Sequence, residues 1–128
     1  MRTAYSIRDL AQEFALTPRT IRHYEEEGLV RPTREGAARI FSNRDRGRLK
    51  LALRCKRLGF PLNEIRELFE LYDLKGEKRQ LKTFLAKLEK RRLLLEQQRE
   101  DIAVMLNEIS FFAAQCERLL REQEKIET

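Results

Sequence analysis

The sequence predicts a mainly α-helical protein, with a small helical domain in its N-terminal half and one long helix at its C-terminal end. Of its 128 residues, 38% are charged and 41% are hydrophobic. Globular proteins have about 25% charged residues, so the apolar residues here suffice for narrow helical stripes. Only 5 Gly and 3 Pro are present, and none follows Gly76. This scarcity of turn residues excludes a β-sandwich and favours helices.

The first part of the chain predicts two short helices joined by a tight connection. Ser6 is placed to cap the first helix, with Asp9 three residues later as the capping-box partner. Apolar residues then recur with helical spacing at Ile7, Leu10, Ala11 and Phe14. Thr17 is a predicted N-cap and Pro18 the first residue of a second helix, which extends to about Glu25. Two helices with so short a joint must cross, as in a helix-turn-helix.

The second helix has two different faces. Ile21 and Tyr24 lie on one face, while Arg19, Arg22 and His23 lie on the other. The face turned away from the core therefore presents two guanidinium groups and an imidazole. This pattern is typical of a recognition helix that enters a groove of DNA.

A small hairpin, or wing, is predicted after the second helix. Gly28 is suited to end that helix in the left-handed conformation, and Pro32 forces an extended backbone. Residues 33–41 then contain a Gly-centred turn before a β-prone run, with Arg34 and Arg39 on the hairpin. The predicted architecture is a winged helix-turn-helix.

Two further helices complete the predicted N-terminal domain, residues 1–74. Ser42 and Asp45 form a second capping box for a helix that extends to Leu58. A fourth helix is expected from Leu62 to about Tyr72, followed by a connection through Gly76.

Residues 75–128 predict one long dimerisation helix with a short C-terminal effector or tail region. An apolar heptad position continues as far as Cys116, with Leu106 in the companion position. A helix of about 40 residues is about 60 Å long, so its stripe needs a second chain to cover it. A helical hairpin is the alternative, but this segment contains no turn signal. The predicted dimer interface comprises Leu81, Leu88, Leu95, Ile102, Leu106 and Ile109.

The charge of the chain is unevenly distributed. Residues 1–60 contain 14 Lys and Arg against 7 Asp and Glu, whereas residues 61–128 contain 13 against 14. Most of the basic residues in the first half are Arg, which makes planar, bidentate contacts with phosphates and base edges. The pattern indicates a polyanionic partner. A solvated basic surface that only confers solubility is the alternative.

Several classes of protein are disfavoured by the sequence. Only one His and two Cys are present, with no C-x-x-C pair, phosphate loop or nucleophile elbow, so neither an enzyme nor a metal or cofactor site is expected. No apolar run reaches the ~18 residues of a membrane span, and the N-terminus lacks the apolar block of a signal peptide. We therefore expect a cytoplasmic protein with no membrane partner.

The stretch from Thr17 to Pro32, TPRTIRHYEEEGLVRP, closely resembles the signature of MerR-type winged-helix regulators. The resemblance continues through Arg39-Ile40-Phe41-Ser42 and Arg57-Leu58-Gly59-Phe60, and covers residues 5 to about 72 in order. The segments 44–51, 56–60 and 71–73 look most like the branch of the family that controls branched-chain amino-acid and acyl-CoA catabolism.

This resemblance implies a homodimer, joined by an antiparallel coiled coil, on a pseudo-palindromic promoter. Family members sit in an over-long spacer between the two polymerase-binding elements and distort the duplex so that RNA polymerase can engage it. Arg19 and Thr20 would approach base edges, with Arg22 and His23 beside them, and the wing would hold the flanking backbone. The DNA-binding residues implied are Thr17, Arg19, Thr20, Arg22, His23, Tyr24, Arg34, Arg39, Phe41 and Arg48.

Some of these residues have a simpler interpretation. Arg22 and Arg39 could pair with Glu25 or Glu35, and the ring of Tyr24 could fill the joint between helices. The family pattern also differs from this chain at three places. His23 stands where relatives often have Tyr or Phe, Ala37-Ala38-Arg39 replaces Gly-Tyr-Arg, and Phe41 stands where a later Tyr is common.

The sequence lacks the cysteine pattern of metal-sensing relatives, and we expect no separate ligand-binding domain. A small-molecule effector would therefore bind near the junction between the long helix and the N-terminal domain of the other chain, or farther along the long helix. The resemblance to the catabolic branch suggests an organic acid or an acyl-CoA. The aromatic residues that would form the effector site are Phe69, Tyr72, Phe84, Phe111 and Phe112. A coiled-coil adaptor, whose basic head binds a protein or an acidic membrane surface, is the competing hypothesis.

Overall fold

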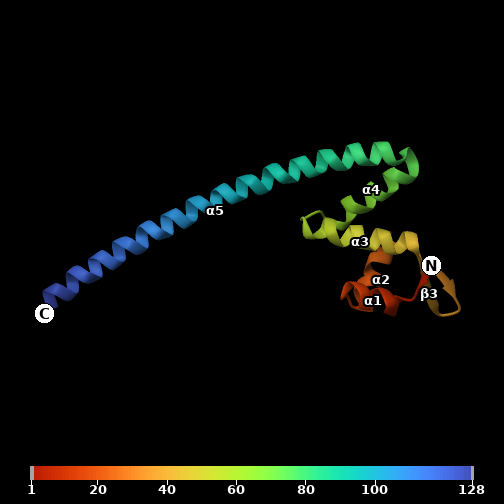
Figure 1. Ribbon diagram of the computed structural model, residues 1–128, viewed down its shortest axis with the longest axis horizontal. Coiled ribbons are helices and arrows are strands. Elements are labelled where there is room, and N and C mark those ends of the chain that lie inside the picture. Colours follow the sequence, from red (N-terminus) through yellow and green to blue (C-terminus); the bar gives the residue numbers. More distant parts are fainter. Residues whose placement is uncertain (1, 128) are drawn as a thin grey trace. The chain divides into compact units, whose positions relative to one another are not determined.

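The computed structural model describes residues 2–127 and is mainly helical, as predicted (Figure 1). The elements are β1 (Ala4–Tyr5), α1 (Ile7–Phe14), α2 (Pro18–Glu26), β2 (Thr33–Glu35), β3 (Ala38–Ser42), α3 (Asn43–Arg57), α4 (Leu62–Lys75) and α5 (Glu77–Glu127). The chain divides into two compact units, residues 1–85 and residues 86–128. We call the first unit the head.

The predicted helix caps are confirmed. Ser6 and Asp9 form a capping box at α1, and Ser42 and Asp45 form one at α3. In each box the serine hydroxyl accepts from the aspartate N–H, and the aspartate carboxylate accepts from the serine N–H. The hydroxyl of Thr17 accepts from the N–H of Thr20 at 3.2 Å and caps α2. These bonds satisfy N–H groups that have no partner inside a helix.

Two left-handed residues set the ends of α1 and α2. Gly28 has φ +80° just after α2, as predicted. The next residue, Leu29, donates its N–H to the carbonyl of Tyr24 at 3.0 Å and is fully buried. Ala15 has φ +54° and ends α1, although L side chains rarely adopt this conformation. The tight connection was predicted, but its left-handed alanine was not.

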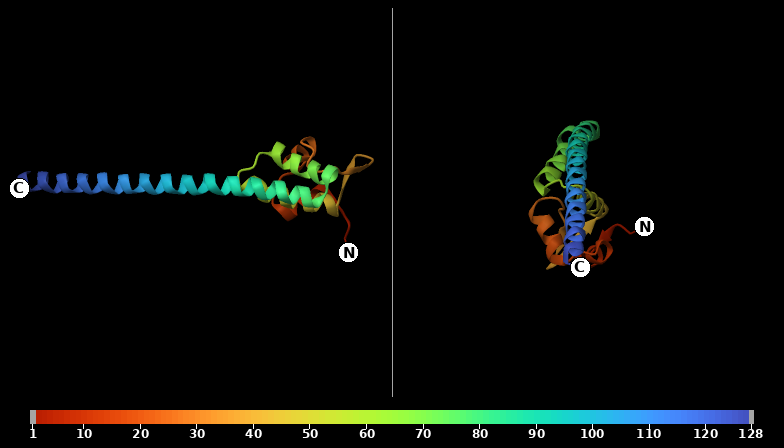
Figure 2. Two further views of the ribbon diagram at one scale, coloured as in Figure 1. Left: turned by 90° about the horizontal axis from the view of Figure 1, so that it is seen from above. Right: turned by 90° about the vertical axis from the view of Figure 1, so that its left-hand side faces the viewer.

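The predicted wing is confirmed and belongs to a small sheet. The three antiparallel strands lie in the order β1-β3-β2, with Tyr5 opposite Phe41 and Arg34 opposite Arg39. Figure 2 shows the β2–β3 hairpin as a projection from the edge of the head. β1 was not predicted, since two residues give no alternating pattern. Its pairing with β3 joins the start of the chain to the base of the wing.

The core of the head lies where α1, α2, α3, α4 and β3 meet. Its largest fully buried side chains are Phe41, Leu10, Ile21, Leu29, Leu49, Ile65 and Val30. α4 extends three residues beyond the predicted Tyr72, and Gly76, with φ +83°, is the one residue between α4 and α5. The expected connection over residues 73–75 is therefore wrong, because these residues add almost one more turn to α4.

The second unit consists of α5 alone from residue 86 onward, and no side chain described in α5 is buried. Its predicted interface residues include Ile102, Leu106 and Ile109, which are 51%, 58% and 62% exposed. In a single chain, an exposed apolar stripe of this length leaves a large apolar surface in contact with water. The uninterrupted helix over this segment agrees with the absence of Gly and Pro after Gly76.

Candidate nucleic-acid interface

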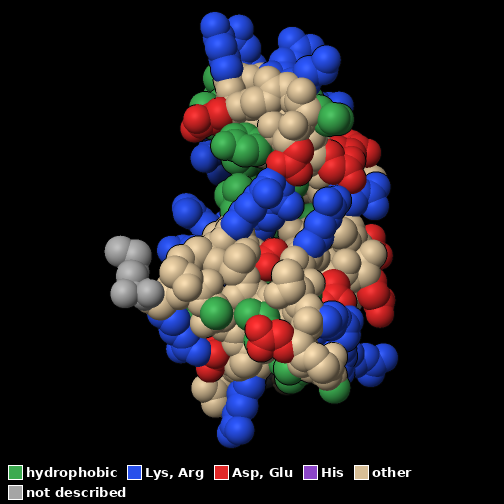
Figure 3. Space-filling model, turned by 90° about the vertical axis from the view of Figure 1, so that its right-hand side faces the viewer, with side chains coloured by type: hydrophobic (Ala, Val, Ile, Leu, Met, Phe, Trp, Pro, Cys, Tyr) green, Lys and Arg blue, Asp and Glu red, His purple; other side chains and the backbone are tan. Residues whose placement is uncertain are grey.

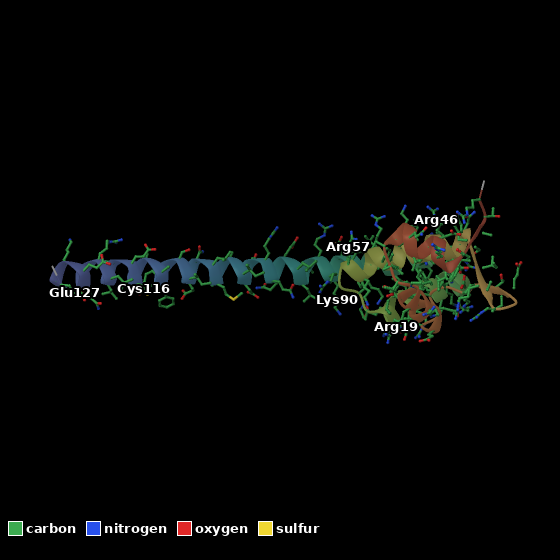
Figure 4. The ribbon with its side chains drawn as sticks, turned by 90° about the horizontal axis from the view of Figure 1, so that it is seen from below. Arg19, Arg46, Arg57, Lys90, Cys116 and Glu127 are labelled. Atoms are coloured by element: carbon green, nitrogen blue, oxygen red, sulfur yellow. The ribbon has the colours of Figure 1, made fainter. Side chains whose placement is uncertain are left out.

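The two faces of α2 are separated as the sequence predicted. Ile21 and Tyr24 are 0% and 3% exposed, whereas Arg19, Arg22 and His23 are exposed. An open pocket of about 520 Å³ on this face is lined by Arg19, Thr20, Arg22, His23 and Glu26. Figure 4 shows Arg19 at the edge of the head. The exposed face of α2 is therefore basic and hollowed.

Arg19 and Arg22 have no ion-pair partner among residues 2–127, so their guanidinium groups keep all of their N–H donors for a ligand. Thr17 and Thr20 lie beside them, with their hydroxyl oxygens 2.9 Å apart. The alternative prediction, a pair between Arg22 and Glu25, is wrong. His23 lies 4.0 Å from Glu26, at the outer limit of an ion pair.

The two arginines of the wing do have a partner. Arg39 donates from Nε to Oε1 of Glu25 at 3.0 Å, and Arg34 donates from Nη2 to Oε2 of the same carboxylate at 3.3 Å. The alternative pairing of Arg39 with Glu25 is thus confirmed. Glu25 lies on α2, so its carboxylate connects the wing to that helix.

Two of the residues implied by the resemblance lie in the core. Phe41 is 0% exposed, so its side chain packs inside the head and cannot contact DNA; that prediction is replaced by a structural role. Tyr24 is 3% exposed, and burial raises the pKa of its hydroxyl, which stays neutral at ordinary pH. The packing interpretation of Tyr24 agrees with this burial.

Arg48 is held inside a contact between α3 and α4. Its Nη2 lies 3.2 Å from Oδ2 of Asp73, its guanidinium lies 5.1 Å from the centre of the Phe69 ring, and its side chain is 13% exposed. Arg44 also donates to Asp73. Burial tends to raise the pKa of Asp73, but the hydrogen bonds and charges of these two arginines outweigh it and lower the pKa. Arg48 therefore links α3 to α4, and its phosphate contact stays a prediction.

A second cluster of arginines could not be predicted from the sequence, because it depends on β1. The guanidinium groups of Arg2 and Arg46 lie 5.0 and 5.6 Å from the centre of the Tyr5 ring. Arg46 also donates to Glu13 at 2.8 Å and thereby lowers the pKa of that carboxyl. Figure 3 shows Lys and Arg side chains interspersed with Asp and Glu on the face that it draws. Half of the 14 arginines of the head are paired with a carboxylate among residues 2–127, unlike those of α2.

The aromatic residues predicted to bind an effector have different environments. Phe69 is 4% exposed beneath Arg48, so a ligand cannot reach its ring in this conformation. Phe84 contacts Phe60, with ring centres 6.3 Å apart, and Tyr72 is exposed. In the second unit, Phe111 and Phe112 are exposed. A shallow pocket of about 300 Å³ there is lined by Phe111, Ala114, Gln115, Arg118 and Arg121.

The remaining side chains give no sign of another chemistry. Among residues 2–127, no group of three or more His, Cys, Asp or Glu side chains is arranged to hold a metal ion. Cys55 is buried, which raises the pKa of its thiol, and Cys116 is exposed. No helix in the described part of the chain has both the length and the apolar character needed to cross a membrane.

A three-stranded sheet with a wing, next to two crossed helices of which the second presents free arginines, defines a DNA-binding winged helix-turn-helix. The comparison with known families agrees: residues 5–71 match the MerR HTH family regulatory proteins, and residues 46–110 match the family described as MerR, DNA binding. The chain belongs to the MerR family of transcriptional regulators, and the proteins that it matches are regulators rather than enzymes.

Individual relatives support the same assignment. The chain is 38% identical over 69 residues to the HTH-type transcriptional regulator ZntR of Escherichia coli K12, which is 52% of this chain and 49% of that protein. It thus spans about half the length of the curated relatives that it matches. A MerR-family regulator from Bacillus cereus has a TM-score of 0.65 at 28% identity, covering 81% of this chain and 75% of its own.

A DNA complex shares the fold. HiNmlR, a MerR-family regulator lacking the sensor domain and bound to promoter DNA, has a TM-score of 0.63 at 22% identity. The alignment covers 87% of this chain and 88% of HiNmlR. At this identity the likeness concerns the fold alone.

Proposed function

We propose that the protein binds promoter DNA as a homodimer through α2 and the wing, and that it controls transcription in response to a small metabolite. The observation that carries the proposal is the exposed face of α2, where Arg19 and Arg22 have no carboxylate partner within the described chain. Elsewhere in the head several arginines are neutralised by acidic residues. Free guanidinium groups on a surface helix are suited to phosphates and to the O6 and N7 acceptors of guanine.

Each group of residues has a separate role in this proposal. Arg19 and Thr20 read base edges in the major groove. The adjacent DNA backbone is contacted by Arg22, His23 and Thr17, the last of which is the N-cap of α2. Arg34 and Arg39 hold flanking phosphates from the wing. Base contacts give sequence selectivity, whereas phosphate contacts give affinity that depends on salt.

Dimerisation is supported by the apolar stripe of α5. Leu95, Ile102, Leu106 and Ile109 are 41–62% exposed in the single chain, and a second copy in an antiparallel coiled coil would cover them. Leu81 and Leu88 continue the same stripe toward the head. A two-fold dimer would present two α2 helices to half-sites about 34–36 Å apart, or a multiple of that distance.

Regulation would act through the shape of the DNA. Bending and untwisting a duplex cost several kcal/mol, so a small change in dimer geometry can decide whether RNA polymerase engages the promoter. The effector in this proposal is an organic acid or an acyl-CoA, as in the branch that controls branched-chain amino-acid and acyl-CoA catabolism. It would bind near Tyr72 and Phe84 or around Phe111 and Phe112. Such a regulator acts in the cytoplasm.

The test begins with a duplex selected from a random library by the native protein. Binding to this duplex and to a scrambled duplex is then measured at one salt concentration by fluorescence anisotropy. Arg19→Ala should reduce the preference for the selected duplex by about 1–3 kcal/mol. Arg121→Ala, which removes the same charge from α5, should leave the preference unchanged. Equal losses on both duplexes for Arg19→Ala would contradict the base contact, and a native protein without preference would instead favour the adaptor hypothesis.

A further inference from the structure

Glu25 joins the recognition helix to both strands of the wing. It lies in the last turn of α2, and its two carboxylate oxygens accept from different strands: Oε1 from Nε of Arg39 in β3, and Oε2 from Nη2 of Arg34 in β2. Arg34 and Arg39 face each other in the register of the hairpin. One side chain therefore fixes the orientation of two cationic side chains at once.

The wing has little else to orient it against α2. All three residues of β2 are exposed, and Ala38 at the start of β3 is exposed as well. Apolar burial in the hairpin is concentrated at Phe41, at the far end of β3 from the turn. The Glu25 and Arg39 side chains are only 21% and 22% exposed, so their ion pair is better shielded from water than one on the open surface.

The pairing leaves each arginine able to bind another group. A guanidinium has five N–H donors, and Glu25 uses one from each of the two arginines. The remaining donors are held in fixed directions, and fixed directions reduce the entropy lost when a ligand is bound. The free oxygens of a DNA backbone phosphate fit such donors.

We propose that Glu25 is a positioning residue for DNA binding, which holds Arg34 and Arg39 of the wing ready to contact two backbone phosphates beside the groove that α2 enters. This inference rests on the proposed function. It assigns to an acidic residue a favourable effect on the binding of a polyanion.

The sign of the effect separates this role from simple charge. If Glu25 were only a negative charge near DNA, its removal would reduce repulsion and strengthen binding. If it positions the two arginines, its removal weakens binding, because the wing arginines are no longer held at the two phosphates and these contacts are lost. Glu27, two residues later, provides the control: among residues 2–127 its side chain makes neither a hydrogen bond nor an ion pair, and it does not line the pocket on α2.

The experiment compares the native 128-residue chain with Glu25→Ala, Glu25→Gln and Glu27→Ala on the selected duplex between about 50 and 200 mM salt. Each phosphate contact contributes about 0.9 to the slope of log K against log salt. Loss of both wing contacts in Glu25→Ala should reduce this slope by about 1.8, so that the fourfold rise in salt weakens binding about twelvefold less than in the native protein. Kd at 50 mM salt should rise, and Glu25→Gln should lie between.

Two further measurements make the result decisive. Glu27→Ala should bind as tightly as the native protein or more tightly, with an unchanged slope. In an Arg34→Ala, Arg39→Ala background, Glu25→Ala should have no further effect on the slope, because there is nothing left to position. Circular dichroism establishes that each variant is folded, and Glu25→Gln, which keeps the shape of the side chain, tests the role if Glu25→Ala is not folded.

The inference is overturned if folded Glu25→Ala or Glu25→Gln binds as tightly as the native protein, or more tightly, with the native slope. Failure of the proposed function would look different, since the native protein itself would then not prefer the selected duplex over the scrambled one. The two failures can therefore be distinguished within one set of titrations.

Discussion

Replacement of Asp45 by Ala should destabilise the head more than the equivalent change at any exposed cap. Asp45 is 6% exposed, and its carboxylate has two backbone donors: the N–H of Arg31 at Oδ1 and the N–H of Ser42 at Oδ2, each at 3.0 Å. Arg31 precedes the wing and Ser42 ends it. One buried carboxylate thus holds both ends of the hairpin segment and the first turn of α3.

The magnitude follows from these bonds. A hydrogen bond to a charged group contributes about 1.5–3 kcal/mol to stability, and a carboxylate in the first turn of a helix adds about 0.3–1 kcal/mol. Arg31 and Ser42 are exposed residues, so water can satisfy part of what Asp45→Ala removes. We therefore expect the free energy of unfolding to fall by about 2–3 kcal/mol, below the full value of two charged hydrogen bonds.

Urea unfolding followed by circular dichroism at one fixed protein concentration measures this loss, since the stability of a dimer depends on concentration. Asp9→Ala is the matched control. Asp9 occupies the same place in the capping box of α1, but its one backbone donor is Ser6, and its side chain is 32% exposed. Asp9→Ala should therefore cost clearly less than Asp45→Ala. Equal shifts of the unfolding midpoint would refute the argument that burial and the Arg31 contact make Asp45 important.

Three further predictions concern pH, assembly and reactivity. The hydrogen bond from Arg46 lowers the pKa of Glu13 below its ordinary 4.5. The difference in the free energy of unfolding between native protein and Glu13→Gln, measured by urea unfolding at several pH values, should therefore be constant above about pH 5.5 and vanish as pH falls through that lowered pKa. A difference that persisted in acid would contradict this prediction. If the protein dimerises as proposed, Ile102→Glu should convert the proposed dimer into monomers in sedimentation velocity at micromolar concentration, whereas Glu100→Gln, off the apolar stripe, should not. In a Cys116→Ser variant, which removes the exposed thiol, Cys55 should react with a thiol reagent only as the protein unfolds, because it is buried and burial raises the pKa of its thiol. Fast labelling of this folded variant would show that the core around Cys55 opens.

The elements with a local signal could be predicted from the sequence. Both capping boxes, the proline at the start of α2 and the left-handed Gly28 depend on residues at most four positions apart, and each is present. The two faces of α2 follow from helical spacing alone. Local periodicity and capping residues are sufficient to place helices in a sequence with a high proportion of charged residues.

Features that depend on distant residues could not be predicted in this way. β1 has two residues and exists because Tyr5 pairs with Phe41, which lies 36 residues later. Arg48 is a second example. Its position on α3 suggests an unpaired cation, and only the packing of α4 places Asp73 against it. The family resemblance predicts that Phe41 contacts DNA, but its position in β3 directs its side chain into the core. Tertiary pairing, not propensity, decides these cases.

The positions of the carboxylates explain why arginines within the same basic head have different roles. Arg44 and Arg48 meet Asp73, Arg46 meets Glu13, and these arginines link helices to one another. On α2 the two exposed arginines have no carboxylate partner within the described residues 2–127. A paired arginine on the open surface adds little to stability, but its direction is fixed, whereas an unpaired one keeps its full charge for a polyanion. The wing combines both properties, because Glu25 fixes Arg34 and Arg39 while leaving most of their donors unused. Function in this domain is therefore determined as much by the positions of its few acidic residues as by its excess of arginine.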